Sequence, residues 1–165
     1  MKQAIVVEHV VIEVQSNFND FTFQLETALG IMTPASFCAD GIVPASMACY
    51  LAGTTEDNEL ILFNILLPND LRKEESGPKI KQYQVCNPRV MSRMIAQNAG
   101  AALYTPLHLL VYEKPNGKVV VEYDLPSSFF TRFNNAAINI DAARLESKLV
   151  KLIKKADAVN GSSQM

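Results

Sequence analysis

The side chains best suited to chemistry lie at one predicted strand-to-helix junction, where Cys86, Asn87 and Pro88 follow one another. A thiol at the start of a helix lies near exposed backbone N–H groups and the positive end of the helix dipole, which favour the thiolate. Such a cysteine could act as a nucleophile or a redox sensor. The same residues also satisfy capping rules, with Asn87 as N-cap, Pro88 at the first helical position and Cys86 as the last buried strand residue. We favour the capping interpretation, because it explains all three residues without any reaction.

The two histidines, His9 and His108, both fall in predicted strands. With Cys86 they could form a three-ligand metal site, but the sequence contains no ligand spacing that supports one. We therefore expect each imidazole to be partly buried and hydrogen-bonded, and we expect no metal or other cofactor.

Two tyrosines, Tyr112 and Tyr123, lie on the strands of a predicted hairpin and could turn their hydroxyls toward a ligand, although Tyr also packs commonly on sheet surfaces. Glu113 and Glu122 lie on the same strands, and we expect them to form a cross-strand ladder with Lys114 and Lys118. The sequence contains none of the common phosphate-loop, dinucleotide, serine-hydrolase or zinc-protease motifs. The candidate ligand-binding residues are Cys86, Asn87, His108, Tyr112 and Tyr123.

Composition narrows the class of protein. The chain has 165 residues, of which 48% are hydrophobic and 19% charged, so it can bury a substantial core and is not a disordered chain. Its net charge of −2 and lack of an arginine cluster argue against nucleic-acid binding. No apolar run is long enough to span a membrane. Three cysteines without a CxxC motif suit a reducing compartment, so we expect a cytoplasmic protein, unless a leader peptide was removed.

Hydrophobic periodicity predicts the elements that position these side chains. Strands are predicted at 4–15, 59–67, 79–86, 106–113 and 118–124, and Pro115-Asn116-Gly117 marks the turn of the hairpin. Helices are predicted at 18–29, 88–98 and 140–157, while periodicity does not decide between helix and strand in 31–58. The order of elements predicts one α+β domain over 1–157 and a frayed tail over 158–165. Its curved, mainly antiparallel sheet has helices packed on one face, including a long C-terminal helix.

An aromatic group, Phe129, Phe130 and Phe133, follows the hairpin in a stretch with little charge. Core packing is its ordinary role, whereas an exposed subset would mark a dimer interface or a hydrophobic ligand site. A sheet whose helices cover one face leaves its edge strands and some apolar surface exposed. We therefore expect a homodimer that buries them, with this aromatic group as the candidate interface.

The order of parts resembles an uncharacterised prokaryotic family, domain of unknown function 302. The similarity covers roughly 8–31 and 80–155 and is carried by VVIEVQSNFNDFTFQLETALG, the CNP turn and the hairpin VYEKPNGKVVVEYDLP. The resemblance implies a TATA-binding-protein-like α+β fold and a small dimeric protein, but no activity. Many relatives have a second cysteine after the proline of the hairpin strand; here Leu107 follows Pro106, which weakens a redox role for Cys86.

Taken together, the sequence predicts a non-catalytic homodimeric module that binds a small, partly apolar ligand between sheet and helix. A thiol-dependent enzyme or redox sensor that uses Cys86 is one alternative. A structural or interaction protein without a ligand pocket is another.

Overall fold

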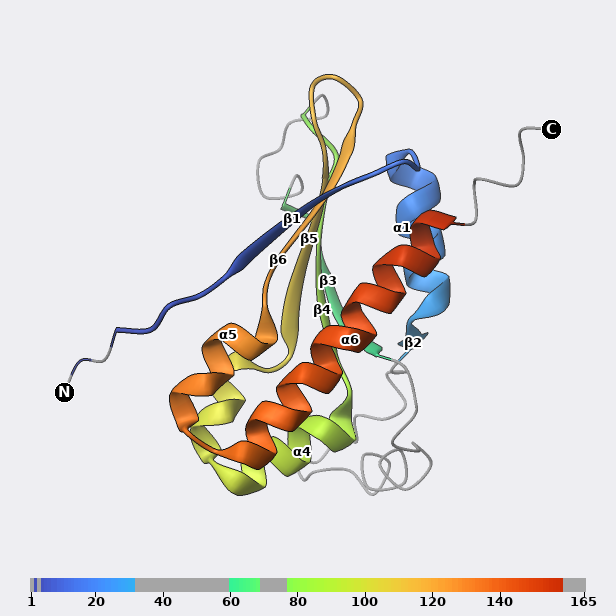
Figure 1. Ribbon diagram of the computed structural model, residues 1–165. Coiled ribbons are helices and arrows are strands. Elements are labelled where there is room, and N and C mark those ends of the chain that lie inside the picture. The colour runs from blue at the N-terminus through green and yellow to red at the C-terminus, as the bar shows by residue number, and fades with distance from the viewer. Residues whose placement is uncertain (1, 3, 32–59, 69–76, 159–165) are drawn as a thin grey trace.

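One sheet and a layer of helices make up the described part of the chain (Figure 1). The computed structural model describes residues 2, 4–31, 60–68 and 77–158. The strands of the sheet lie in the order β1-β6-β5-β4-β3-β2. In chain order they are β1 (His9–Val14), β2 (Gly30–Ile31), β3 (Ile61–Leu66), β4 (Ile80–Cys86), β5 (Leu107–Glu113) and β6 (Val119–Asp124).

The helices complete an α+β fold, as the sequence predicts. All neighbouring strands pair antiparallel, except that the two residues of β2 run parallel to β3. The long C-terminal helix α6 packs against α1, α4 and α5. The helical elements are α1 (Phe18–Ala28), α4 (Pro88–Gln97), η2 (Ala99–Tyr104), α5 (Pro126–Phe130), η3 (Thr131–Phe133) and α6 (Ala136–Ala158).

Side-chain alternation gives the sheet two different faces. Toward the helices, the strands contribute Tyr83, Leu109 and Val121, each with no exposed surface, to the hydrophobic core. Tyr83 donates a hydrogen bond to Glu26 Oε1 of α1 at 2.8 Å, so even this polar end is satisfied. On the opposite face, His9 of β1 is half exposed. Polar strand residues are therefore concentrated on the face that the helices leave open.

Asparagine side chains set the starts of three α-helices. Asn17 Oδ1 accepts from the N–H of Asp20 at the start of α1, and Asn87 caps α4 ahead of Pro88, as the sequence predicts. Asn135 Oδ1 accepts from the backbone N–H groups of Ala137 and Ile138 at 2.9 and 3.2 Å. This cap starts α6 at residue 136, so the predicted start at 140 was wrong by four residues.

The β5–β6 hairpin forms at the predicted turn. Gly117 has φ +81°, and Asn116 Oδ1 accepts from the N–H of Lys118 at 3.1 Å. The predicted glutamate–lysine ladder across the hairpin was wrong. Lys114 and Lys118 instead pair with Glu13 of the neighbouring strand β1, which the sequence could not place there.

The aromatic group is internal, which corrects its candidate role as an interface. Phe130 has no exposed surface and Phe129 only 7%, while Phe133 packs beside them. Their segment forms α5 and η3, two elements that the sequence analysis missed. A homodimer would have to use another surface.

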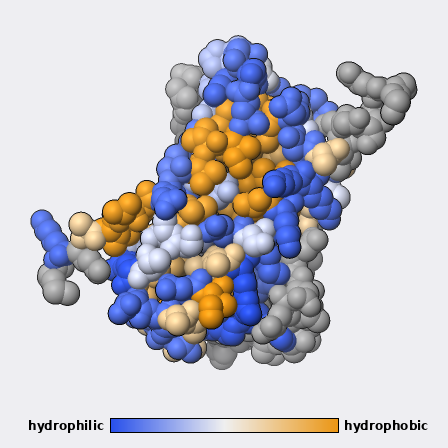
Figure 2. Space-filling model, viewed as in Figure 1, coloured by the Kyte–Doolittle hydropathy of each residue, from blue (hydrophilic) through white to orange (hydrophobic). Residues whose placement is uncertain are grey.

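Apolar surface is exposed elsewhere. Figure 2 shows apolar atoms on the N-terminal arm, at the left of the view, and in a patch that lies above α6 in the picture. On the arm, which continues β1 beyond its pairing with β6, Val6 is 83% and Val7 40% exposed.

Within the described residues, no helix is both long and apolar enough to cross a bilayer. The undecided segment 32–58, with Cys38 and Cys49, and the tail 159–165 lie outside the described residues.

We predict that Asn87→Ala lowers the free energy of unfolding by about 1–2 kcal/mol. The side chain has no exposed surface, and its Oδ1 accepts from the N–H groups of Arg89 and Val90, both at 3.1 Å. Water cannot replace a buried cap, so the loss should exceed that of Asn135→Ala, whose side chain is partly exposed. Urea denaturation of both variants and the wild type measures this difference, and a wild-type midpoint for Asn87→Ala would contradict the assignment.

Candidate functional site

The Cys86 junction is a buried structural turn. Cys86 has 1% of its surface exposed, and burial raises the pKa of its thiol far above the ordinary value of 9.0. The register of β4 and β5 pairs Val85 with Leu107, so the residue after Pro106 lies beside this turn and is apolar. Asn87 uses its side-chain oxygen to cap α4. These observations favour the capping interpretation over an activated thiolate.

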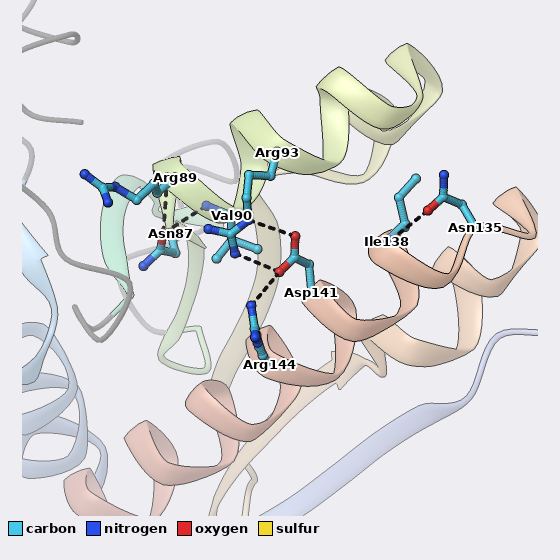
Figure 3. A network of polar contacts seen from close by, with 8 residues as sticks. All are labelled: Asn87, Arg89, Val90, Arg93, Asn135, Ile138, Asp141 and Arg144. Carbon is cyan, nitrogen blue, oxygen red and sulfur yellow. Dashed lines mark hydrogen bonds and ion pairs between the residues drawn. The ribbon is translucent and has the colours of Figure 1, made fainter. Parts of the chain in front are cut away.

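A buried carboxylate joins α4 to α6 close to this turn (Figure 3). The Asp141 side chain is 8% exposed and accepts two hydrogen bonds from Arg93, one from Nε at 3.2 Å and one from the terminal nitrogen at 2.7 Å. Arg144, one helical turn along α6, contributes a third contact at 3.3 Å. Sequence reasoning missed this network, although Asp141 lies within the apolar stripe of α6 and was the signal that could have revealed it.

A chain of polar side chains crosses three strands on the open face of the sheet. The Tyr112 hydroxyl on β5 donates to Glu122 Oε1 at 2.6 Å. Glu122 Oε2 on β6 lies 3.3 Å from His9 Nε2 on β1, and His9 Nδ1 lies 2.8 Å from Asp124 Oδ1. The strand register explains the arrangement, because His9 pairs with Asp124 and Glu122 lies two residues along the same strand.

This geometry favours the protonated form of His9. Both ring nitrogens face carboxylate oxygens, so both can donate only when the imidazole carries two protons. The hydrogen bond to Asp124, followed by the one to Glu122, raises the pKa of His9 above its ordinary value of 6.5. The imidazolium in turn neutralises part of the negative charge of Asp124 and Glu122. Its contacts with these two residues hold the edge strand β1 against β6.

A small cavity lies where β5 begins and β6 ends, beside η2 and α5. It has a volume of about 150 Å³, which suits a single ring-sized group. Two polar groups, His108 and Asp124, line it together. Its apolar lining is Val7, Leu103, Tyr104, Pro106, Leu107 and Phe129. We refer to it as the β5–β6 cavity.

The aromatic wall of the β5–β6 cavity is held in place by its neighbours. The Tyr104 ring stacks on Phe129 with centroids 5.3 Å apart and a 27° angle between the rings. Arg132 donates to the Tyr104 hydroxyl and places its guanidinium 5.3 Å from the ring centroid. This packing holds the two aromatic rings of the wall in place.

The candidate residues thus fall into separate groups. His108 lines the β5–β6 cavity, and His9 reaches the same cavity indirectly through Asp124. Tyr112 and Tyr123 lie on opposite faces, since Tyr112 bonds Glu122 on the open face whereas Tyr123 is buried in the core. Burial, followed by the charge of Glu146, raises the pKa of Tyr123. Sequence reasoning missed Tyr104 and Asp124 as cavity residues.

The two histidines do not assemble a cluster of metal ligands. The amide nitrogen of Gln84 lies 3.3 Å from His108 Nε2, and His9 is held by two carboxylates. Among the described residues, no group of three or more His, Cys, Asp or Glu side chains is arranged to hold a metal ion.

Known proteins are similar to the part of the chain that contains β4, α4, the β5–β6 hairpin and α6. The profile of the family "Domain of unknown function DUF302" matches residues 71–156, more than half of the chain. The chain belongs to the DUF302 family. A crystal structure described as an uncharacterized conserved DUF302 protein from Bacillus stearothermophilus has the same fold, with a TM-score of 0.63 and 16% identity. The match covers 90% of this chain and 97% of that one. No curated protein matches the chain, so DUF302 membership supplies a fold and no activity.

We predict that His9 titrates above 6.5 and that Asp124→Asn lowers its pKa more than Glu122→Gln does. Each carboxylate stabilises the imidazolium, so removing its charge shifts deprotonation to lower pH, and Asp124 makes the closer contact. NMR titration of the imidazole carbon-bound protons gives the three values. An unchanged His9 pKa in Asp124→Asn would refute the pairing.

Proposed function

We propose that this DUF302 protein is a non-catalytic module that binds a small, partly apolar ligand in the β5–β6 cavity. The observation that carries the proposal is the lining, in which two packed aromatic rings and several aliphatic side chains lie beside two polar side chains, His108 and Asp124. Small-molecule sites commonly combine an apolar wall with a few polar groups that fix the orientation of the ligand.

The lining also suggests the chemistry of the ligand. A volume of about 150 Å³ accommodates one six-membered ring, and Tyr104 and Phe129 offer aromatic surface for it. Asp124 can accept a hydrogen bond from the ligand, since a carboxylate has several acceptor positions and His9 occupies one oxygen. We therefore expect a ring that carries an amine or another donor, and not a ring that carries a carboxylate.

The alternative of a thiol-dependent enzyme has less support. A nucleophilic cysteine needs an accessible sulfur and a depressed pKa, whereas Cys86 is buried with a raised pKa. His9 has a strongly polar environment, but it is engaged by two carboxylates and lies outside the cavity lining.

The proposal includes a homodimer that forms through the β1 edge and the N-terminal arm. In the described sheet, β1 pairs only with β6, so its outer edge is available to another strand. The arm before it exposes Val6 and Val7, apolar β-branched residues suited to strand pairing. Antiparallel pairing of two such edges about a two-fold axis would cover them. Because Val7 also lines the β5–β6 cavity, dimerisation would help to close the ligand site.

Binding can be tested with benzylamine and benzoate, which share a ring but carry opposite charges. We predict that benzylamine shifts the NMR signals of residues that line the cavity with a Kd on the order of 1 mM, a typical affinity for so small a ligand. Benzoate should not bind, because Asp124 repels its carboxylate. Val7→Trp should fill the cavity and abolish the benzylamine shifts.

Ile140→Trp is the control, because it adds the same side chain at an exposed apolar position on α6, outside both this cavity and the proposed interface. It should leave benzylamine binding unchanged. Equal binding of both probes, or shifts that persist in Val7→Trp, would show that the cavity is not the ligand site.

A further inference from the structure

A chain of polar side chains connects the open face of the sheet to the β5–β6 cavity. It begins where the Tyr112 hydroxyl donates to Glu122 Oε1 at 2.6 Å. His9 follows between two carboxylates, with Nε2 3.3 Å from Glu122 Oε2 and Nδ1 2.8 Å from Asp124 Oδ1. Asp124 in turn lines the cavity. A titratable imidazole is therefore one side chain away from the proposed ligand.

Asp124 is the group that the imidazole and a ligand would share. Its Oδ1 faces His9, and a carboxylate has enough acceptor positions to bind a second donor through its other oxygen. A protonated amine in the cavity and a protonated His9 would then be two cations on one carboxylate. Like charges this close disfavour each other's charged form, so the proton and the amine compete.

The charges that face His9 come from β6, the strand that pairs with β1. They are the carboxylates of Asp124 and Glu122, and both favour the imidazolium. Glu13 lies on the same face of β1, but it is paired with two lysines of the hairpin. His108 is a second titratable group in the cavity lining, so an experiment must separate its effect from that of His9.

We propose that a cationic ligand in the β5–β6 cavity displaces the proton of His9, which leaves from Nε2 to solvent. Nε2 makes the longer contact, whereas Nδ1–H keeps its 2.8 Å hydrogen bond to Asp124. Glu122 then retains the hydroxyl donor of Tyr112. This linkage rests on the proposed ligand site and adds its regulation: the affinity for an amine rises as His9 loses its proton.

The probe is benzylamine, whose Kd for the full chain is measured by NMR at a series of pH values from below 6.5 upward. Benzylamine stays protonated through neutral pH, so a change in Kd in that range reports on the protein. The contact with Asp124 raises the pKa of His9 above 6.5, so the affinity should increase above that pH. We expect an increase of about threefold to fivefold, the usual effect of one exposed charge pair.

His9→Gln should remove this increase, because glutamine can donate to Asp124 but cannot gain a charge. The matched control is His108→Gln, which makes the same substitution in the cavity lining. It can change the affinity itself, but it should retain the increase that belongs to His9. Glu122→Gln lies outside the lining and should move the increase to lower pH, because it removes a charge that stabilises the imidazolium.

Linkage also works in the reverse direction. Saturating benzylamine should lower the pKa of His9 by about 0.5 to 0.7 pH unit, which is the same threefold to fivefold factor. Benzyl alcohol has the same ring and an uncharged donor, so its Kd should not depend on the protonation of His9.

The outcomes separate this linkage from the ligand site on which it rests. No binding of benzylamine at any pH would overturn both. Binding with a Kd that does not change with pH, or a change that persists in His9→Gln and disappears in His108→Gln, would overturn the linkage alone. An equal change with benzyl alcohol would also overturn it, because competition between charges would then not be the cause.

Discussion

The buried Asp141 carboxylate is the constraint on which the helix layer depends. A charge at 8% exposure must be paired, and removing its partner typically costs about 3–5 kcal/mol. Arg93 supplies a two-pronged partner from α4, and this geometry fixes both the distance and the rotation of α4 against α6. Because α6 also packs against α1 and α5, one ionic contact sets the reference position for the whole layer.

The candidate site follows from the position of α6. Its apolar stripe, which includes Leu145 and Leu149, closes the core against the sheet. The Asn135 side chain caps the start of α6, so this helix begins directly after α5 and η3. That short connection keeps Phe129 against Tyr104, and the β5–β6 cavity owes its aromatic wall to this contact.

The sequence predicted those features that depend on neighbouring residues. The Asn87 cap, the turn at Gly117 and the α+β class follow from local rules of capping, turn chemistry and periodicity. It could not predict contacts that depend on strand order and helix packing. His9 meets Asp124 only because β1 lies beside β6, 115 residues away in the chain, and Arg93 meets Asp141 across 48 residues. Asp141 within the apolar stripe of α6 signals that it needs a partner but not which one, and nothing local signals the contact of His9 with Asp124. The identity of the partners in both networks therefore became visible only in the fold.

Native mass spectrometry of the protein purified from its own host is the most direct test of the proposed homodimeric ligand-binding module. It preserves subunit contacts and retained small molecules in one measurement. The account predicts a dimer that carries one small molecule per chain, and it predicts that Val7→Trp loses the added mass because Val7 lines the cavity. A bare monomer would contradict the account, and a dimer with no added mass would contradict ligand binding in the β5–β6 cavity.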